Sequence, residues 1–308
     1  MPAFCTHHLF LQKLKDEIGK DFEFNIQAAE IGTQGPDIFF FNRIIPLFMP
    51  GKSKADIGRR LHRSKAEDLF NAFAEYMKLH PNDIAKSYIY GFIMHYALDR
   101  RCHPYVYSMQ EKIKEKNHFI HKSSAHNKVE MAMDSFLLNK YCLISNPRSF
   151  RADKCLGSDP AVDREIGRVL EFVVPKVTGD RLSAEQAAAA VRDTRKMQKI
   201  LTDKTGLLNV FCVIFETLLA PFIMFFKFSS MIKPGDLEKA KKYVNIDRQP
   251  WQSPFDGSVH NESFEELFTL AAEDARALIK GFNNICNGSE TAFDVTQNIS
   301  FLTGIEVK

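Results

Sequence analysis

Apolar residues recur at steps of three and four along most of this chain, the spacing that places them on one face of a helix. The pattern predicts helices at roughly 8–19, 64–79, 83–102, 123–142, 160–178, 183–202 and 262–283. No segment shows a convincing alternation of apolar and polar residues, which would be typical of a strand. We therefore expect an all-α fold.

The length of 308 residues fits one large domain or two small ones. Residues 32–56 are rich in glycine and proline and predict a loop, and residues 144–158 predict a connection. We place a soft boundary near position 150. Residues 1–150 would form a helical core and residues 151–308 a helical C-terminal part, or the two would be one continuous helical body.

Net charge, cysteine content and the N-terminal sequence limit which partners and which cellular compartment we expect. The net charge of +3 is too balanced to argue for nucleic-acid binding. The six cysteines are scattered without a Cys-x-x-Cys pair, and the first residues lack the basic and apolar regions of a signal peptide. We expect a cytoplasmic protein with free thiols.

The most apolar stretch is 207–226, which is near the ~20 residues that a membrane span requires. Asn209, Glu216 and Pro221 interrupt it and count against spanning. We favour a buried helix kinked at Pro221. The alternative is a helix that faces lipid or a partner, which would give the protein a peripheral membrane contact.

The helix predicted at 83–102 carries two polar residues within its apolar pattern, and a third follows directly after its end. His95, Asp99 and His103 follow one another at steps of four, so they lie on one helix face, one turn apart. Imidazole and carboxylate are ligand types of zinc. This stripe is therefore a candidate metal site.

The helix predicted at 123–142 repeats the spacing with His126 and Glu130, and Asp134 follows one turn later. Further candidates outside these two helices are His7, Asp37 and His62. Burying so many ionisable groups without a cation would carry a large desolvation cost. We therefore favour a metal site over a solvated polar face.

The chain resembles the zinc-dependent phospholipase C family, and most closely a bacterial branch that is not secreted. The resemblance rests on an ordered set over about the first 140 residues: Met1-Pro2 with Thr6-His7, Gly35-Pro36-Asp37, His62, His95-x3-Asp99-x3-His103-Pro104 and His126-x3-Glu130. It implies a multi-helix zinc hydrolase fold, with a cleft in residues 1–150 that holds two to three zinc ions. The second half, 151–308, carries no matching motif.

The resemblance also assigns ligands. It implies one zinc held by Asp37, His62, His95 and Asp99, a second held by His103, His126 and Glu130, and a third held by His7 and the bridging Asp99. In the family, the chain's N-terminal amine completes the third site, and in secreted members processing creates that amine. This chain begins with Met1-Pro2, which departs from that pattern.

The residues and the resemblance both point to hydrolysis of a phosphoester by a metal-activated water. Asp37 is the candidate catalytic residue, which would orient or deprotonate the water. The substrate would be a phospholipid or another small phosphoester, and Arg59, Arg60 and Arg63 are candidates for holding its phosphate.

Other functions are less well supported. The alternative is a non-catalytic helical binding or scaffold protein with a structural zinc cluster, but a carboxylate-rich ligand set without cysteine favours hydrolysis. An HD-type phosphohydrolase would need an adjacent His-Asp pair, which the sequence lacks. A single-strand nuclease would be expected to carry more positive charge around its cleft.

Overall fold

The computed structural model describes residues 4–45, 49, 51–219 and 227–307. Its α-helices are α1 (Phe4–Ile18), α2 (Ile26–Thr33), α3 (Ala55–Leu61), α4 (Ala66–Leu79), α5 (Asp83–Lys116), α6 (Lys122–Cys142), α7 (Ala152–Cys155), α8 (Pro160–Thr178), α9 (Ala184–Ile200), α10 (Leu207–Leu219), α11 (Leu237–Lys241), α12 (Phe264–Asn287) and α13 (Ala292–Thr296). The 3₁₀ helices are η1 (Gly35–Phe39), η2 (Pro147–Ser149) and η3 (Phe228–Met231), and the strands are β1 (Trp251–Gln252) and β2 (Val259–His260). The predicted all-α fold is confirmed, since one two-stranded hairpin is the only sheet within the described ranges.

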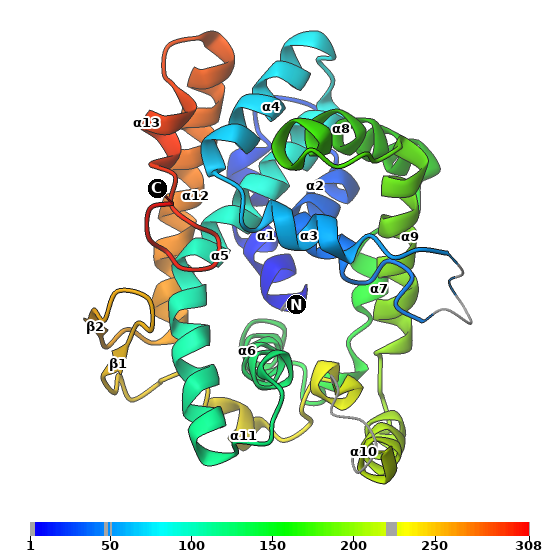
Figure 1. Cartoon of the computed structure of the whole chain (residues 1–308), viewed down its shortest axis with the longest axis vertical. Coiled ribbons are helices and arrows are strands. Elements are labelled where there is room, and N and C mark those ends of the chain that lie inside the picture. Colours follow the sequence, from blue (N-terminus) through cyan, green and yellow to red (C-terminus); the bar gives the residue numbers. More distant parts are fainter. Residues whose placement is uncertain (1–3, 46–48, 50, 220–226, 308) are drawn as a thin grey trace.

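Helix α5 is the centre of the molecule. It runs through the body in Figure 1, with α12 along one side and α2 and α6 packed against it. Its first turn is capped by Asn82, whose side chain accepts a hydrogen bond from the backbone N–H of Ala85 at 2.8 Å. The helix continues past the predicted end to Lys116 despite Pro104 in its interior. It therefore carries the whole stripe from His95 to His103.

Helices α2 and α5 approach closely because glycines face each other. A Cβ atom at Gly32 would lie 2.2 Å from the carbonyl oxygen of Tyr88, and one at Gly91 would lie 2.2 Å from that of Ala29. Both distances are impossible for real side chains, so this contact requires glycine on each helix. The close contact brings the loop that follows α2 against the polar face of α5.

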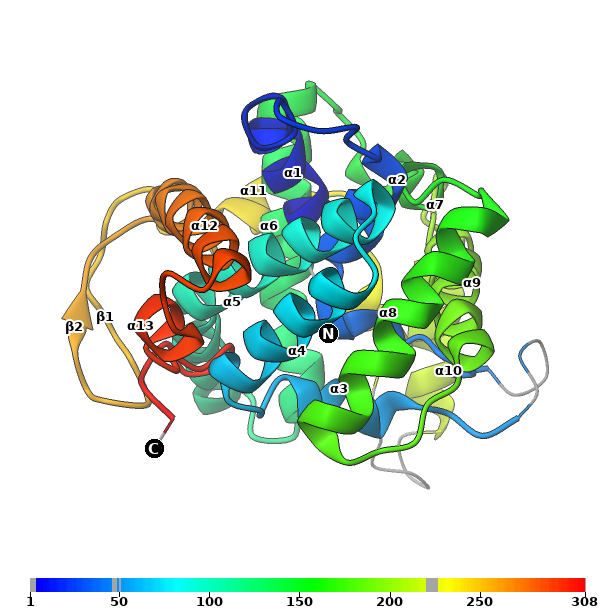
Figure 2. The ribbon, with the colours of Figure 1, turned by 90° about the horizontal axis from the view of Figure 1, so that it is seen from above.

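Helices α8 and α9 pack together on the side of the molecule away from α12, as Figure 2 shows. Helix α9 also holds the predicted loop: the Asp193 carboxylate accepts hydrogen bonds from the Asn42 side chain at 3.0 Å and from the backbone N–H of Arg43 at 3.2 Å. The segment after η1 is therefore fixed from the C-terminal half of the chain.

The main hydrophobic core runs from Phe4 to Phe301 and uses residues from both sides of position 150. The C-terminal segment returns to α5, where the Tyr96 hydroxyl donates a hydrogen bond to the carbonyl oxygen of Ile299 at 2.7 Å. The division of the chain near position 150 stays a prediction.

The prediction of a buried helix at 207–226 is wrong for the part that the structure describes. Helix α10 lies at the edge of the molecule, and most of its large apolar side chains are exposed, whereas Glu216 is buried. The predicted kink at Pro221 lies outside the described residues. Among the described helices, none is both long and apolar enough to cross a bilayer.

Candidate metal centre and cleft

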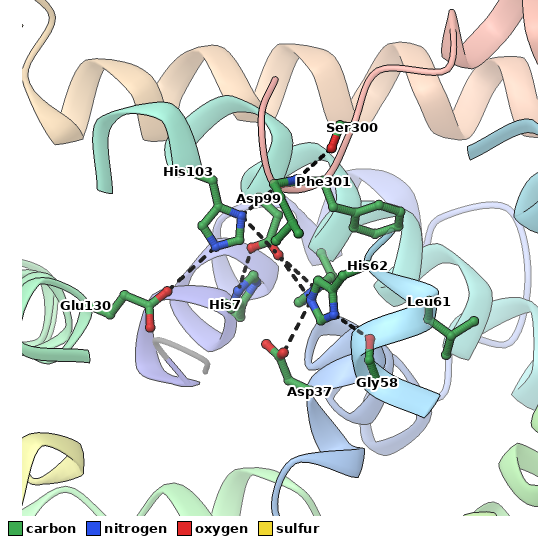
Figure 3. Close-up of polar contacts among 12 residues, drawn as sticks. His7, Asp37, Gly58, Leu61, His62, Asp99, His103, Glu130, Ser300 and Phe301 are labelled. Atoms are coloured by element: carbon green, nitrogen blue, oxygen red, sulfur yellow. Dashed lines mark hydrogen bonds and ion pairs between the residues drawn. The ribbon is translucent and has the colours of Figure 1, made fainter. Parts of the chain in front are cut away.

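The candidate ligands come from five parts of the fold and converge on one place, as Figure 3 shows for six of them. They are His7 on α1, Asp37 on η1, His62 directly after α3, His95, Asp99 and His103 on α5, and His126 and Glu130 on α6. All eight side chains are buried. The structure therefore brings together every metal-ligand candidate of the sequence-based assignment.

Asp99 is the hub of the cluster. Its Oδ1 lies 3.3 Å from Nε2 of His7, and its Oδ2 lies 3.1 Å from Nε2 of His95. Oδ2 also lies 3.7 Å from Nε2 of His62 and 3.6 Å from Nδ1 of His103. One carboxylate thus lies among four imidazoles, and Asp99 would be a ligand of any cation bound there.

Two further carboxylates flank the hub. Oδ1 of Asp37 lies 3.3 Å from Nε2 of His62. Oε1 of Glu130 lies 3.2 Å from Nε2 of His126 and 3.8 Å from Nε2 of His103. The cluster thus has an Asp37 side and a Glu130 side, with α5 between them.

Four of the histidines are oriented in the same manner by oxygen atoms that only accept hydrogen bonds. Their Nδ1 atoms lie 2.8 Å from Gly58 O for His62, 3.0 Å from Thr33 O for His95, 2.7 Å from Phe301 O for His103 and 3.1 Å from Gln110 Oε1 for His126. Each Nδ1 must therefore donate, which leaves Nε2 with a free lone pair in the neutral ring. This is the orientation that metal-binding histidines adopt.

Several buried polar atoms of the cluster lack a partner in the described parts of the chain. They are Nδ1 of His7, Nε2 of His95 and Oε2 of Glu130. Nε2 of His95 lies 3.1 Å from Oδ2 of Asp99, but the two atoms form no hydrogen bond. Unpartnered buried groups are costly, so these atoms fit a site that is completed by a cation.

The ligand atoms form three groups in which all atoms lie within 4.8 Å of one another. These groups are His7 with His95 and Asp99, Asp37 with His62 and His95, and His103 with His126 and Glu130. They agree with a cluster of more than one ion, and His95 belongs to two groups. The donor set of imidazole and carboxylate fits zinc.

The pKa shifts in the cluster show that its buried carboxylates favour positive charge on the groups around them. Burial alone would raise the pKa of Asp99, but His103 and His95 hold it well below its usual value. Burial likewise opposes the charged form of His103, yet Asp99 and Glu130 raise its pKa to about 9. The two carboxylates thus favour the protonated form of His103. A divalent cation would supply that charge directly.

All of the ligand candidates except His95 line an open cleft of about 620 Å³. Arg59 and Arg63 line this cleft, whereas Arg60 forms an ion pair with Asp180 at 2.6 Å and is not among its lining residues. Arg59 also contacts Asp56. Arg63 lines the cleft and has no acidic partner within the described ranges. It is therefore the best placed of the three arginines that the sequence predicts to bind phosphate.

Asp134, which the sequence places one turn after Glu130, does not join the metal groups. Its carboxylate accepts hydrogen bonds from the backbone N–H groups of Cys5 at 3.0 Å and Thr6 at 2.7 Å, and from the Thr6 hydroxyl at 2.8 Å. These are otherwise unpaired donors at the start of α1. Asp134 therefore anchors the helix that presents His7.

The neighbour of His7 has a different environment. Nδ1 of His8 lies 2.7 Å from Oε1 of Glu30, so His8 is engaged outside the cluster. This supports His7 as the candidate ligand of α1. The N-terminal amine falls on residues outside the described ranges, and its contribution to a third zinc site stays a prediction.

The backbone conformation and the close approach of His95 both require glycine at position 35. Its φ is +50°, in the left-handed region, and a Cβ atom there would lie 2.4 Å from Cδ2 of His95. Pro36 then lies in the first turn of η1, where it has no N–H to leave unpaired. The tight turn places Asp37 beside the imidazole of His62.

Sequence analysis missed several residues of the site, including residues that line the cleft and one that orients a ligand candidate. Tyr107 and Gln110 extend the α5 stripe at steps of four and three beyond His103, so helical spacing contained the information needed to find them. Phe301 holds His103 through its backbone carbonyl, and its side chain gives no indication of this role. Only the folded chain brings it to α5.

Comparison with known protein families gives a match. The model described as zinc dependent phospholipase C matches residues 1–176, which is more than half of the chain. Comparison with curated proteins and with solved structures gives no significant match. The matched region contains all eight candidate ligands but not Phe301.

Proposed function

Because the chain belongs to the zinc-dependent phospholipase C family, we propose that it hydrolyses a phosphoester bond of a phospholipid or a related phosphodiester. The observation that carries this proposal is the cluster of eight buried ligand candidates, of which all but His95 line an open cleft. A purely structural zinc site is closed by protein ligands, whereas a catalytic site keeps room for water and substrate.

The three ligand groups would hold the zinc ions, with Asp99 as the bridging ligand. When bound, zinc neutralises charge on phosphate oxygens and lowers the pKa of water. Gly58, Thr33 and Phe301 fix the imidazoles through backbone carbonyls, so the ligands are held in place before metal arrives.

Asp37 is our candidate for accepting the proton of the attacking water. Its carboxylate lines the cleft, and Oδ1 lies 3.3 Å from Nε2 of His62. It can thus touch a metal ligand on one side and a water in the cleft on the other. A base must lie within hydrogen-bond reach of the water that it deprotonates.

Arg63 and Lys122 are candidates for binding the substrate phosphate. Arg63 follows the ligand His62, and Lys122 begins the helix that carries His126 and Glu130. Both line the cleft. A guanidinium and an ammonium in these positions would attract an anionic group and orient it.

The test of the metal centre is elemental analysis of the untagged protein, with His95→Ala beside it. We expect two to three zinc ions per chain in the wild type and fewer in the variant. His260→Ala is the matched control, because His260 lies on the hairpin strand β2, outside the cluster. Absence of metal after zinc loading would refute the proposed centre.

The test of the catalytic role is Asp37→Asn, assayed on a water-soluble phosphodiester. We expect most of the metal to remain and the turnover number to fall by about 10²–10⁴, the usual contribution of a general base. Asp56→Asn, a change at an exposed acid of α3, is the control. Wild-type turnover in Asp37→Asn would show that Asp37 is not the base.

A further inference from the structure

Helix α10 exposes an apolar surface that the proposed chemistry does not use. Its exposed large side chains are Leu207, Val210, Phe211, Val213, Ile214, Phe215 and Leu218. The exposed fraction reaches 65% for Phe211 and 68% for Leu218. A contiguous apolar surface of this kind marks a site of interaction with a protein or a membrane.

The acidic side chains in α10 and just before it are buried and do not contribute to this surface. Glu216, the only acid in α10, is buried, and its carboxylate accepts hydrogen bonds from the backbone N–H of Ser229 at 2.8 Å and from its hydroxyl. Asp203 is also buried and accepts from the N–H groups of Leu208 and Asn209 at the start of the helix. The exposed face therefore carries no negative charge of its own.

Four exposed lysines lie close to α10 in sequence or in space. Lys199 and Lys204 precede α10, Lys227 follows it in sequence, and Lys128 lies nearby on α6; all are exposed. Partial burial of its ammonium group and then repulsion from Lys227 lower the pKa of Lys128, and the buried Glu216 opposes this shift, so Lys128 lies near both residues. None of the four pairs with an acid within the described ranges. An apolar face with free lysines close to it complements a surface that is apolar inside and anionic at its edge.

The helix is also connected to the cleft. It packs on η3, where the Ser230 hydroxyl accepts a hydrogen bond at 3.2 Å from Asn127, a lining residue of the cleft. On its other side, Leu208 of α10 packs on the same small hydrophobic cluster as Ile44, which also lines the cleft. A surface that binds α10 would therefore lie beside the rim of the cleft.

We propose that α10 is a lipid-docking helix that lies in the headgroup region of a phospholipid bilayer and places the cleft beside its substrate. The inference rests on the proposed function, since only a lipid substrate would have to be taken from a bilayer. An amphipathic helix needs no complementary groove in a membrane, and Lys204 and Lys227 would meet lipid phosphates there. A second copy of this chain is the weaker occupant, because its α10 would bring a second set of lysines close to the first.

The first test is sedimentation with vesicles of phosphatidylcholine and phosphatidylglycerol. We expect the wild type to bind, and the double variant Phe211→Ser/Phe215→Ser to bind at least about tenfold more weakly, because two apolar side chains are lost from the interface. Val259→Ser is the matched control: Val259 is equally exposed but lies on β2, on the opposite side of the molecule from α10 in both views. Equal vesicle binding of the wild type and the double variant would overturn the proposal.

A second measurement tests insertion without relying on loss of binding. The single natural tryptophan, Trp251, is buried. Phe215→Trp therefore adds one exposed tryptophan, whose emission should shift to the blue when vesicles are added. An unchanged spectrum in the presence of bound vesicles would place another surface against the lipid.

Failure of docking and failure of the proposed chemistry give different results. If both proposals hold, the double variant keeps wild-type turnover on a water-soluble phosphodiester and loses it on vesicles. If only the chemistry fails, the wild type still binds vesicles but hydrolyses neither substrate. A dimer in sedimentation velocity that the double variant abolishes would assign α10 to a second copy and overturn lipid docking.

Discussion

The ligand cluster and α10 both depart from the usual distribution of side chains, in which polar groups are exposed and apolar groups are buried. The cluster departs from it by burying polar groups, and α10 departs from it by exposing apolar ones. The cluster buries three carboxylates and five imidazoles, whereas α10 exposes phenylalanine and leucine to solvent and buries its only acid. Polar groups are normally buried only with partners, and large apolar patches are rare on monomers. Each region therefore carries a free-energy cost in the isolated chain, and a binding partner would remove it. For the cluster this is a cation, and for α10 we propose lipid.

The strongest test of this comparison is removal of metal. The apo-protein should unfold more readily, because the buried carboxylates lose the cation that neutralises them. At a free zinc concentration ~1,000 times the dissociation constant, bound metal contributes about 4 kcal/mol to the free energy of unfolding. The measurement is thermal unfolding before and after dialysis against a chelator, and again after zinc is restored.

His95→Ala and His260→Ala sharpen that measurement. The first variant should show a smaller change on chelation than the wild type, because His95 contributes to two ligand groups. His260 lies on β2, so its variant should respond as the wild type does. An equal change in all three proteins would mean that the chelator acts elsewhere.

The polar cluster could be predicted from sequence because helical spacing is short-range. Asp99 lies four residues from both His95 and His103, so these three side chains share a face whatever surrounds the helix. The backbone carbonyls that orient the rings could not be predicted. Phe301 O is nearly 200 positions away from His103 in sequence, and a carbonyl has no residue-type preference.

A second prediction concerns the anchor of α1. Asp134→Ala would leave the N–H groups of Cys5 and Thr6 and the Thr6 hydroxyl without their acceptor. We expect the free energy of unfolding to fall by about 2–4 kcal/mol. The zinc content should also fall toward that of a protein without His7, since α1 is no longer held. Chemical denaturation and elemental analysis measure the two effects.

Thr6→Val is the graded control for this prediction, because it removes only the hydroxyl donor and leaves the two backbone bonds to Asp134 in place. Its effect on unfolding should be smaller than that of Asp134→Ala. If Asp134→Ala unfolds like the wild type and keeps its zinc, the carboxylate does not position the ligand helix.

Helix α10 shows the limit of the sequence argument. Its apolar content correctly indicated a helix, but apolarity alone does not say whether a helix faces the core, a partner or lipid. In the sequence, Glu216 interrupts the apolar stretch and disfavours a membrane span. In the structure, it is the residue that faces inward, toward Ser229, and so leaves the apolar residues outside. Its partner lies after the stretch, which local periodicity does not reveal.

The prediction with the smallest expected effect tests whether the apolar side chains of α10 serve binding or folding. Phe211→Ser/Phe215→Ser should change the free energy of unfolding by less than about 0.5 kcal/mol in the absence of vesicles, because substitutions at exposed positions rarely change stability more. The two rings contact each other, with centroids 6.1 Å apart, and both are more than half exposed. Chemical denaturation measures this, with Val259→Ser as the control. A loss of 2 kcal/mol or more, on the order of that for a buried core residue, would mean that α10 is part of the core in solution, and the contrast between the two regions would disappear.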